Sequence, residues 1–347
     1  MFDIVTIGSA TRDTFIESNK ASILSVSAVD RHAEYLCFPY GSKVDLDNFY
    51  RDDGGGGLNT AVNFAKLGFK TTTVVKVGSD EVGTAILKDL PEKGVDSSNV
   101  VVDKERATGF SIILVSFQGD RTVLAHRGAN AHIQEADINL KNIKAAKWLY
   151  VAPLAGDSNK VLNKIATFAE KNNVKLALNA GTTGILKGEK YFSHILKTAE
   201  IFVLNKEEAM LLTKLPVRPD TKKEAFSTMP IHPDIATIIK RIKSITSGVV
   251  VLTDGKNGCW AYDGTKFYIA PMFPAKVKTT LGAGDAFTST FVGAMEKFGD
   301  DIEKSLKYAS VSAASVVEYY GAQEGFLTFE QIEKRLVGHP DYKITVF

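Results

Sequence analysis

Short apolar runs alternate with longer stretches in which apolar residues recur at helical spacing. The chain begins with one such run, Phe2–Gly8, which is typical of a buried first strand. From about residue 146 the alternation is regular, with a helix predicted over Asn159–Lys171 and strands over Trp148–Val151, Lys175–Leu178, Ile201–Leu204 and Val249–Thr253. This order indicates βαβ units and therefore an α/β fold, a doubly wound, mainly parallel sheet flanked by helices.

Two pairs of short strands interrupt this pattern. The first pair is predicted at Thr14–Glu17 and Tyr35–Pro39, and the second at Thr108–Phe117 and Thr122–His126. The second pair flanks Gln118–Arg121, whose Gly-Asp dipeptide indicates a hairpin turn. We therefore expect a small separate β-sheet, inserted at about 14–50 and 108–127, that covers a site as a lid.

The bulk composition fits a single α/β domain over residues 1–347. Of the 347 residues, 44% are hydrophobic, which is ample for a sizeable core. The 42 basic and 40 acidic side chains leave a net charge of +2, so nothing in the charge favours a nucleic-acid or membrane partner. Two distant cysteines, no signal pattern and no apolar span of about 20 residues favour a cytoplasmic protein. Pro216–Pro233 is expected to be a surface insertion.

The main chemical signal is Thr279–Phe287, a tight loop that leads into a helix. Unpaired amides and the helix dipole make an anion site there, and the small residues Gly282, Ala283 and Gly284 let a phosphate approach the backbone. Asp285 gains nothing from a neighbouring anion, so we interpret it as a base that takes a proton from a hydroxyl attacking the bound phosphoryl group. Taken alone, the stretch fits equally a helix start at which Asp285 is only a cap.

A second glycine-rich stretch, Asp53–Ala61, runs into an amphipathic helix that begins near Asn59 and is capped by Gly68. A strand over Thr72–Val77 follows it. A flexible linker would not lead directly into such a helix. We therefore interpret the stretch as a substrate loop, with Asn59 as a side-chain contact.

Several polar side chains directly follow predicted strands, and in a doubly wound sheet they fall along one edge. They are Asp13, Asn179, Asn205 and Thr253. Asp13, in the loop after the first strand, fits either a hydrogen bond to a substrate hydroxyl or a turn. Asn205 and Glu208 share one side of a first helical turn, a spacing that fits a magnesium site reached through water and also a capping box. Both interpretations can hold together.

In combination, these stretches resemble the ribokinase/PfkB-type carbohydrate kinase family, from residue 3 to about 330 and in the family's order. The resemblance covers its two glycine-containing signatures, its Asn-x-x-Glu motif, its nucleotide-side strand and turn, and its closing helix and loop. The segments are 54–61 with Gly68 and Gly78, Gly282–Asp285, Asn205–Glu208, Thr253–Gly258 and Ala313–Ala322. Each motif alone is weak, but five in order are specific.

The resemblance implies an ATP-dependent kinase that phosphorylates a hydroxymethyl group of a sugar, sugar derivative or nucleoside. Asp285 would be the base, and the amides of Ala283, Gly284 and Asp285 would form the anion hole. Glu208 would hold Mg²⁺ together with the phosphates. The nucleotide contacts would be Asn205, Thr253, Gly255 and Gly258. The substrate contacts would be Asp13, Gly55, Gly56 and Asn59, to which its place at the sheet edge adds Asn179. The small sheet would be the lid, which in some members also pairs two subunits into a homodimer.

Three features depart from the family pattern. Thr279 stands where members often carry an Asp that is tied to a monovalent-cation site in some of them, which makes potassium activation doubtful. Gly56 occupies a position that is Lys in ribokinases proper, which argues against ribose as the substrate. The segment 19–50 is longer than in a minimal member, which indicates an enlarged lid.

The residues do not select one acceptor. Arg127, after the strand Thr122–His126, fits either a contact to a phosphate or carboxylate of the substrate or a solvated hairpin end. A nucleoside kinase of the same fold is one alternative function. A non-catalytic sugar- or nucleotide-binding protein is another, although binding alone does not need Asp285. A Rossmann-type NAD enzyme lacks support, because Gly8 is not followed by a GxGxxG spacing.

Overall fold

A ten-stranded sheet forms the centre of the protein. The computed structural model describes residues 1–18, 20–28, 31–115, 121–218 and 230–347. Strands β8, β6, β1, β12, β13, β14 and β15 lie side by side in parallel, and β16, β17 and β18 extend the sheet antiparallel beyond β15. Their bounds are β1 (Ile4–Ile7), β6 (Thr71–Val74), β8 (Val95–Asp96), β12 (Trp148–Val151), β13 (Lys175–Asn179), β14 (Ile201–Asn205), β15 (Val249–Thr253), β16 (Cys259–Tyr262), β17 (Phe267–Ala270) and β18 (Thr345–Val346). The mainly parallel sheet predicted from the alternation is confirmed.

Helices cover both faces of this sheet, which is why its strands are apolar on both sides. In β12, Trp148 and Tyr150 join one core cluster and Leu149 and Val151 the other, because successive side chains point to opposite faces. The first cluster contains α1 (Gly56–Lys66), α9 (Ala283–Phe298) and α10 (Ile302–Val316), with α11 (Phe329–Val337) packed on α10. The second contains α3 (Leu140–Ile143), α4 (Leu162–Asn172), α5 (Gly181–Ile185), α6 (Glu189–Thr198), α7 (Lys206–Thr213) and α8 (Pro233–Lys243). Helix α2 (Glu81–Glu92) packs near α1.

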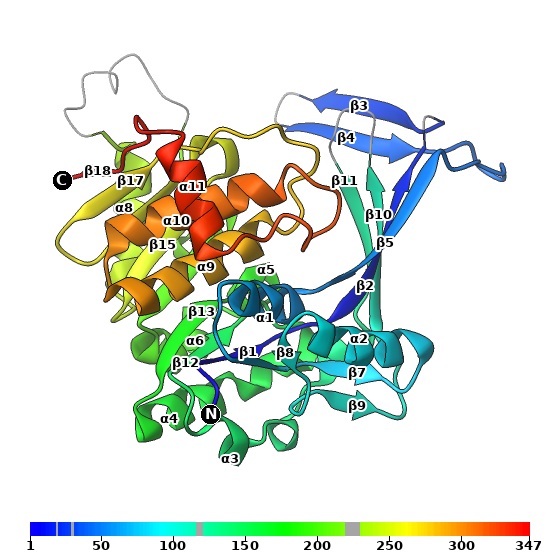
Figure 1. Ribbon diagram of the computed structural model, residues 1–347. Helices are drawn as coiled ribbons and strands as arrows, with labels where there is room; N and C mark the ends of the chain where they lie inside the picture. Colours follow the sequence, from blue (N-terminus) through cyan, green and yellow to red (C-terminus); the bar gives the residue numbers. More distant parts are fainter. Residues whose placement is uncertain (19, 29–30, 116–120, 219–229) are drawn as a thin grey trace.

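A separate four-stranded sheet stands out from this body, as the two interrupting strand pairs predicted. Its order is β11-β10-β2-β5, and a two-stranded hairpin of β3 and β4 lies at its far end (Figure 1). We call these six strands the lid. They are β2 (Thr11–Glu17), β3 (Ser22–Ala28), β4 (Arg31–Cys37), β5 (Asn48–Gly54), β10 (Gly109–Val115) and β11 (Arg121–His126).

The structure corrects two local predictions near the site. Asp13 lies inside β2 and not in a loop, because β2 begins at Thr11, where it pairs with β10 on one side and β5 on the other. The first helix begins at Gly56 and not near Asn59, so Asn59 already lies within α1. Pairing partners so distant in sequence leave no trace in a local pattern.

Other predicted elements differ in extent. The strand predicted over Thr72–Val77 is two strands, β6 in the main sheet and β7 (Lys76–Gly78), which pairs with β9 (Val101–Asp103). The strand predicted at Tyr35–Pro39 is the end of β4. Most of the turn predicted at Gln118–Arg121, and residues 219–229 of the Pro216–Pro233 insertion, lie outside the described residues. In the part of the chain that is described, no helix is both long and apolar enough to cross a membrane.

Candidate active site

The start of α9 forms an open helix N-terminus. Gly282 is its N-cap in a left-handed conformation, with φ of 79°, and a Cβ at this position would lie 2.8 Å from the Ala322 carbonyl oxygen. Only glycine meets both conditions without strain. The amides of Gly284 and Asp285 are in the first turn, where helix geometry provides no carbonyl partner. The predicted anion site therefore has the required backbone.

The Asp285 carboxylate turns away from its own helix and reaches α1. Its Oδ2 accepts a hydrogen bond from Asn59 Nδ2 at 2.8 Å, so the interpretation of Asp285 as only a cap is wrong. A Cβ added to Gly56 would lie 3.5 Å from Asp285 Oδ1, which leaves that oxygen facing a position without a side chain. Burial raises the pKa of Asp285, the Asn59 hydrogen bond lowers it, and the Asp13 charge raises it further.

A second buried amide fixes the two helices relative to each other. Asn63 lies one turn after Asn59, and its Nδ2 donates to Ser289 Oγ at 2.7 Å and to Thr290 Oγ1 at 2.9 Å. Ser289 lies one turn after Asp285. The pair Asn59–Asp285 is thus held by an adjacent polar contact of the same two helices, and its geometry does not depend on one hydrogen bond.

The lid strands hold a second carboxylate beside the first. Asp13 in β2 is 7% exposed, its Oδ1 accepts from Thr11 Oγ1 at 3.0 Å, and burial raises its pKa. On β5, a Cβ at Gly54 would lie 2.0 Å from Asp13 Oδ2, so a side chain there would displace the carboxylate. Gly55 follows with φ of 93° and a Cβ position 2.6 Å from the Ser9 carbonyl oxygen. The glycine-rich stretch therefore gives space to Asp13 as well as to a ligand.

A cavity of about 280 Å³ opens between the lid and the carboxyl ends of the parallel strands. It is lined, among others, by His126, Arg127, Asn130, Thr182, Thr183 and Glu208. Arg127 is exposed at this cavity, and Asn179 ends β13 two residues before Gly181, which also lines it. The structure thus brings Arg127 and Glu208, predicted for different roles, to one cavity.

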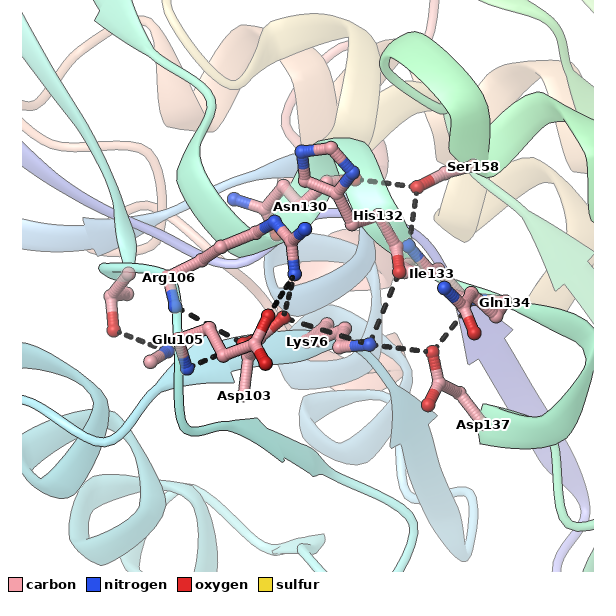
Figure 2. A network of polar contacts seen from close by, with 12 residues as sticks. Lys76, Asp103, Glu105, Arg106, Asn130, His132, Ile133, Gln134, Asp137 and Ser158 are labelled. Carbon is pink, nitrogen blue, oxygen red and sulfur yellow. Dashed lines mark hydrogen bonds and ion pairs between the residues drawn. The ribbon is translucent and has the colours of Figure 1, made fainter.

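The floor of this cavity depends on a residue that the sequence analysis missed. Asn130, 1% exposed in the 3₁₀ helix η1 (Gly128–His132), accepts from Ala10 N at 2.9 Å and donates to Ala10 O at 2.7 Å. It therefore fixes the backbone immediately before β2 and Asp13. Figure 2 shows the network around η1. There Lys76 Nζ donates to the His132 carbonyl at 3.1 Å and to Asp137 Oδ2 at 2.9 Å.

A second cleft, of about 360 Å³, borders the α9 N-terminus. Its lining includes Thr253, Gly255 and Gly258, predicted as nucleotide contacts, together with Ala283 and Gly284 of the predicted anion hole. The rest of its lining is mostly apolar and includes Met272, Phe273, Val277, Ala313 and Ala314. Asn205 pairs in register with Thr253 at the ends of β14 and β15. A flat aromatic ring with a phosphate tail fits such a lining.

Asn205 and Glu208 form the predicted capping box of α7. Asn205 Oδ1 accepts from Glu208 N at 2.8 Å, and Glu208 Oε2 accepts from Asn205 N at 3.1 Å. Glu208 Oε1 also accepts from Thr182 Oγ1 at 3.2 Å. Burial raises the pKa of Glu208, and its hydrogen bonds with Asn205 and Thr182 lower it. The described residues contain no group of three or more His, Cys, Asp or Glu that could hold a metal ion.

Comparison with known proteins identifies the family of the chain. The pfkB family carbohydrate kinase model matches residues 20–328. The chain belongs to the pfkB family of carbohydrate kinases. It is 27% identical to the ribokinase of Bacillus subtilis (strain 168), over 97% of this chain and 100% of that protein. It is 25% identical to the 5-dehydro-2-deoxygluconokinase of Geobacillus thermodenitrificans (strain NG80-2), over 88% of this chain and 89% of the relative. Its fold is that of the Arabidopsis thaliana ribokinase complexed with ribose and ATP, with a TM-score of 0.77, 22% identity, and coverage of 96% of this chain and 98% of that one.

Family membership rules out one alternative function, but it does not assign roles to individual residues of the site. A Rossmann-type NAD enzyme is wrong, because the protein is a carbohydrate kinase. Asp285 itself lines neither of the two cavities. The first helical turn of α9 borders the nucleotide-side cleft, and the carboxylate of Asp285 faces Gly56 and Asn59. Four residues that help hold this arrangement carry no motif and have no distinctive signal in the sequence: Asn63, Lys93, Asn130 and Gln323. Lys93 Nζ donates to Gln323 Oε1, and Gln323 Nε2 donates to Asn59 Oδ1.

Proposed function

We propose that this kinase transfers the γ-phosphoryl group of ATP to a hydroxymethyl group of a sugar or sugar derivative, with Asp285 as general base. The position of Asp285 supports this proposal most directly, since it lies next to the open helix N-terminus and reaches α1 through Asn59. A hydroxyl bound between Asp13 and Asp285 would have a proton acceptor on one side and a phosphate-sized anion site on the other.

The reaction assigned to this geometry is a direct displacement. The acceptor oxygen forms a bond to the γ-phosphorus, the bond from that phosphorus to the ADP oxygen breaks, and the hydroxyl proton passes to Asp285 Oδ1. Asn59 holds Oδ2, so Oδ1 is the free oxygen of the carboxylate. The amides of Gly284 and Asp285 bind the equatorial oxygens, where negative charge collects in the transition state.

Magnesium fits this site through water and phosphate. Both oxygens of Glu208 already accept hydrogen bonds, from Asn205 N and Thr182 Oγ1, so the carboxylate suits an indirect contact better than a complete protein cage. When bound, the ion would neutralise the charge of the phosphates. Nucleotide contacts are proposed at Asn205, Thr253, Gly255 and Gly258, which line or adjoin the second cleft.

For the acceptor we propose a sugar derivative that carries an anionic group. Arg127 and His126 line the substrate-side cavity, and a guanidinium binds a carboxylate or phosphate in two places. The names of two relatives, a ribokinase and a 5-dehydro-2-deoxygluconokinase, are in keeping with a sugar or a sugar-derived acceptor. Asp13, Gly55, Gly56, Asn59 and Asn179 are proposed to contact its hydroxyls. A nucleoside remains the second candidate, because exposed lid aromatics such as Phe110, 44% exposed, offer a stacking surface.

We also propose that the lid pairs with the lid of a second copy. Leu24, Val26 and Tyr35 of the β3–β4 hairpin are 55%, 46% and 53% exposed, which leaves an apolar surface uncovered in one chain. Sedimentation of the protein should show a dimer, and Leu24→Asp should shift it to a monomer with an unchanged circular dichroism spectrum. A parent protein that sediments as a monomer at tens of micromolar would contradict the pairing.

The substitution Asp285→Asn tests the proposed base. It keeps the size of the side chain and an oxygen for Asn59, so kcat should fall by about 10²–10⁴-fold while the thermal shift caused by ATP and magnesium is retained. Turnover within tenfold of the parent would reject Asp285 as the base. A thermal-shift panel of sugars, sugar acids, sugar phosphates and nucleosides, each with a non-hydrolysable ATP analogue, would identify the acceptor.

A further inference from the structure

A continuous chain of side-chain hydrogen bonds leads from Asp285 to the base of the lid. Asn59 Nδ2 donates to Asp285 Oδ2 at 2.8 Å, and Asn59 Oδ1 accepts from Gln323 Nε2 at 3.0 Å. Gln323 Oε1 in turn accepts from Lys93 Nζ at 2.8 Å, and Lys93 also pairs with Asp53 Oδ2 at 3.3 Å. Asp53 lies on β5 and forms a further ion pair with Arg12 of β2.

The chemistry of the two ends fixes the direction of every bond in this chain. An amide side chain can present either its oxygen or its NH₂ group in a given direction, whereas an ammonium group only donates and a carboxylate only accepts. Because Lys93 donates to Gln323 Oε1, the NH₂ group of Gln323 faces Asn59. That donor occupies Asn59 Oδ1 and leaves its NH₂ group facing Asp285.

Burial makes this ordering effective. Asn59 and Gln323 are 4% and 9% exposed, so a reversed amide would place two carbonyl oxygens or two NH₂ groups together with little water to separate them. A reversed Asn59 would also turn a carbonyl oxygen toward the Asp285 carboxylate. The resulting repulsion would disfavour the ionised form of Asp285, which is the form that accepts a proton.

We propose that Gln323 is a positioning residue for phosphoryl transfer: held by Lys93, it keeps the Asn59 amide oriented so that an N–H faces Asp285. The inference rests on the proposed role of Asp285 as base. It assigns to Gln323 and Lys93, which are at least one side chain removed from the reacting atoms, control over the charge of the base. Lys93 is itself held by the lid, because it pairs with Asp53 of β5, which pairs with Arg12 of β2.

Two other titratable groups face Asp285, and neither is altered by the test. Asp13 of β2 raises the pKa of Asp285 through its charge. Tyr150 of β12 is fully buried, and burial first and the Asp285 charge second raise the pKa of its hydroxyl. Both remain in every variant. The Lys93 charge also lowers the pKa of Asp52, so all variants are compared in an Asp52→Asn background, in which that titration is absent.

The decisive variant is Gln323→Glu, with the pH profile of kcat/KM as the measurement. The new carboxylate only accepts, so the Asn59 NH₂ group turns toward it and away from Asp285. The acidic limb of the profile should move up by about one pH unit, a loss of about tenfold in kcat/KM at the acidic side. Gln323→Met interrupts the series of hydrogen bonds but does not reverse the Asn59 amide. It should shift the acidic limb by less than half as much. Lys93→Met should shift it in the same direction as Gln323→Glu.

Added charge and failed folding are separated by controls. Gln331→Glu makes the same charge change on α11, where the side chain caps through an oxygen that Glu retains, and it should leave the profile unchanged. If Gln323→Glu does not fold, the Lys93→Met profile decides instead.

An acidic limb that stays within 0.2 pH units in Gln323→Glu, or an equal shift in Gln323→Met, overturns the inference. The outcome for Asp285→Asn shows whether the general-base proposal or only the role of Gln323 has failed. If Asp285→Asn stays active, the general-base proposal fails and the inference falls with it. If Asp285→Asn is inactive and Gln323→Glu behaves as the parent, only the role of Gln323 is wrong.

Discussion

The two ends of the site are built in different ways. The anion end is one contiguous stretch, in which a left-handed Gly282 turns the chain into α9 and the backbone amides of the first turn do the binding. The acceptor end is assembled from β2, β5, η1, α5 and the end of β11, and its side chains do the binding. A backbone site recognises the phosphate common to every reaction of this kind, whereas a side-chain site can change its acceptor by single substitutions. Most of the predictions that follow affect one end and spare the other, and the last leaves both intact.

Among the variants that compare the two ends, the largest effect is expected from Gly54→Ala at the acceptor end. Its Cβ would lie 2.0 Å from Asp13 Oδ2, so the carboxylate must move by an ångström or more. A misplacement of that size costs about 10²-fold in kcat/KM for the acceptor, while the KM for ATP should stay within twofold. Steady-state kinetics in both substrates checks this. Gly338→Ala, at an exposed helix end, is the control. If Gly54→Ala raised the KM for ATP as much as the KM for the acceptor, the two ends would not be separate.

Glu208→Gln separates the two roles that the sequence leaves open for this residue. Glutamine at the same position preserves the capping box, so α7 should keep its stability. It removes the charge proposed to act on magnesium, so activity should fall by about 10–100-fold and the magnesium concentration for half-maximal rate should rise. Glu207→Gln, an exposed neighbour in the same turn, is the matched control. Activity of Glu208→Gln within twofold of the parent would leave Glu208 as a cap alone.

The sequence predicts the parts of the molecule that depend on local residues better than the parts that are assembled from distant ones. Strand, turn and helix signals are local, so the parallel sheet, the lid and the start of α9 could be predicted from the residues themselves. Asp13 was expected in a loop because its strand depends on β5 and β10, whose pairing residues lie tens of positions away. Asn130 and Gln323 were missed for a related reason. A lone Asn or Gln has no distinctive spacing, and its importance comes from the side chains that folding places beside it.

Arg127→Ala should affect only acceptors that carry a negative charge. Hydrogen bonds to a charged group contribute about 1.5–3 kcal/mol, so the KM for a sugar acid or sugar phosphate should rise about tenfold or more, with kcat nearly unchanged. Neutral sugars serve as the internal control, because they have no group for the guanidinium to bind. A KM that rises equally for neutral and anionic acceptors would show that Arg127 shapes the cavity and does not select charge.

The smallest effect concerns stability and leaves both ends of the site intact. Asp52 lies on β5 next to Asp53, the lid residue that pairs with Lys93. Its Oδ2 is buried and has no hydrogen-bond partner among the described residues. Burial, opposed by Lys93, raises the pKa of Asp52 from 3.8 to about 6. A carboxyl whose pKa is higher in the folded state stabilises the fold only when protonated, so this contribution is lost as the pH rises through about 4 to 6.

Asp52→Asn removes that titration and keeps an oxygen for the Asp53 amide, which now donates to Asp52 Oδ1 at 2.8 Å. At pH 8 the variant should be more stable than the parent by about 1 kcal/mol, because water that reaches the site reduces the effect below the full shift. At pH 4 the two proteins should unfold at the same urea concentration, since the parent carboxyl is then largely protonated in the folded state. Urea unfolding at the two pH values measures the difference. A variant that is less stable than the parent at pH 8 would mean that the attraction between Lys93 and the Asp52 charge outweighs the cost of burying it.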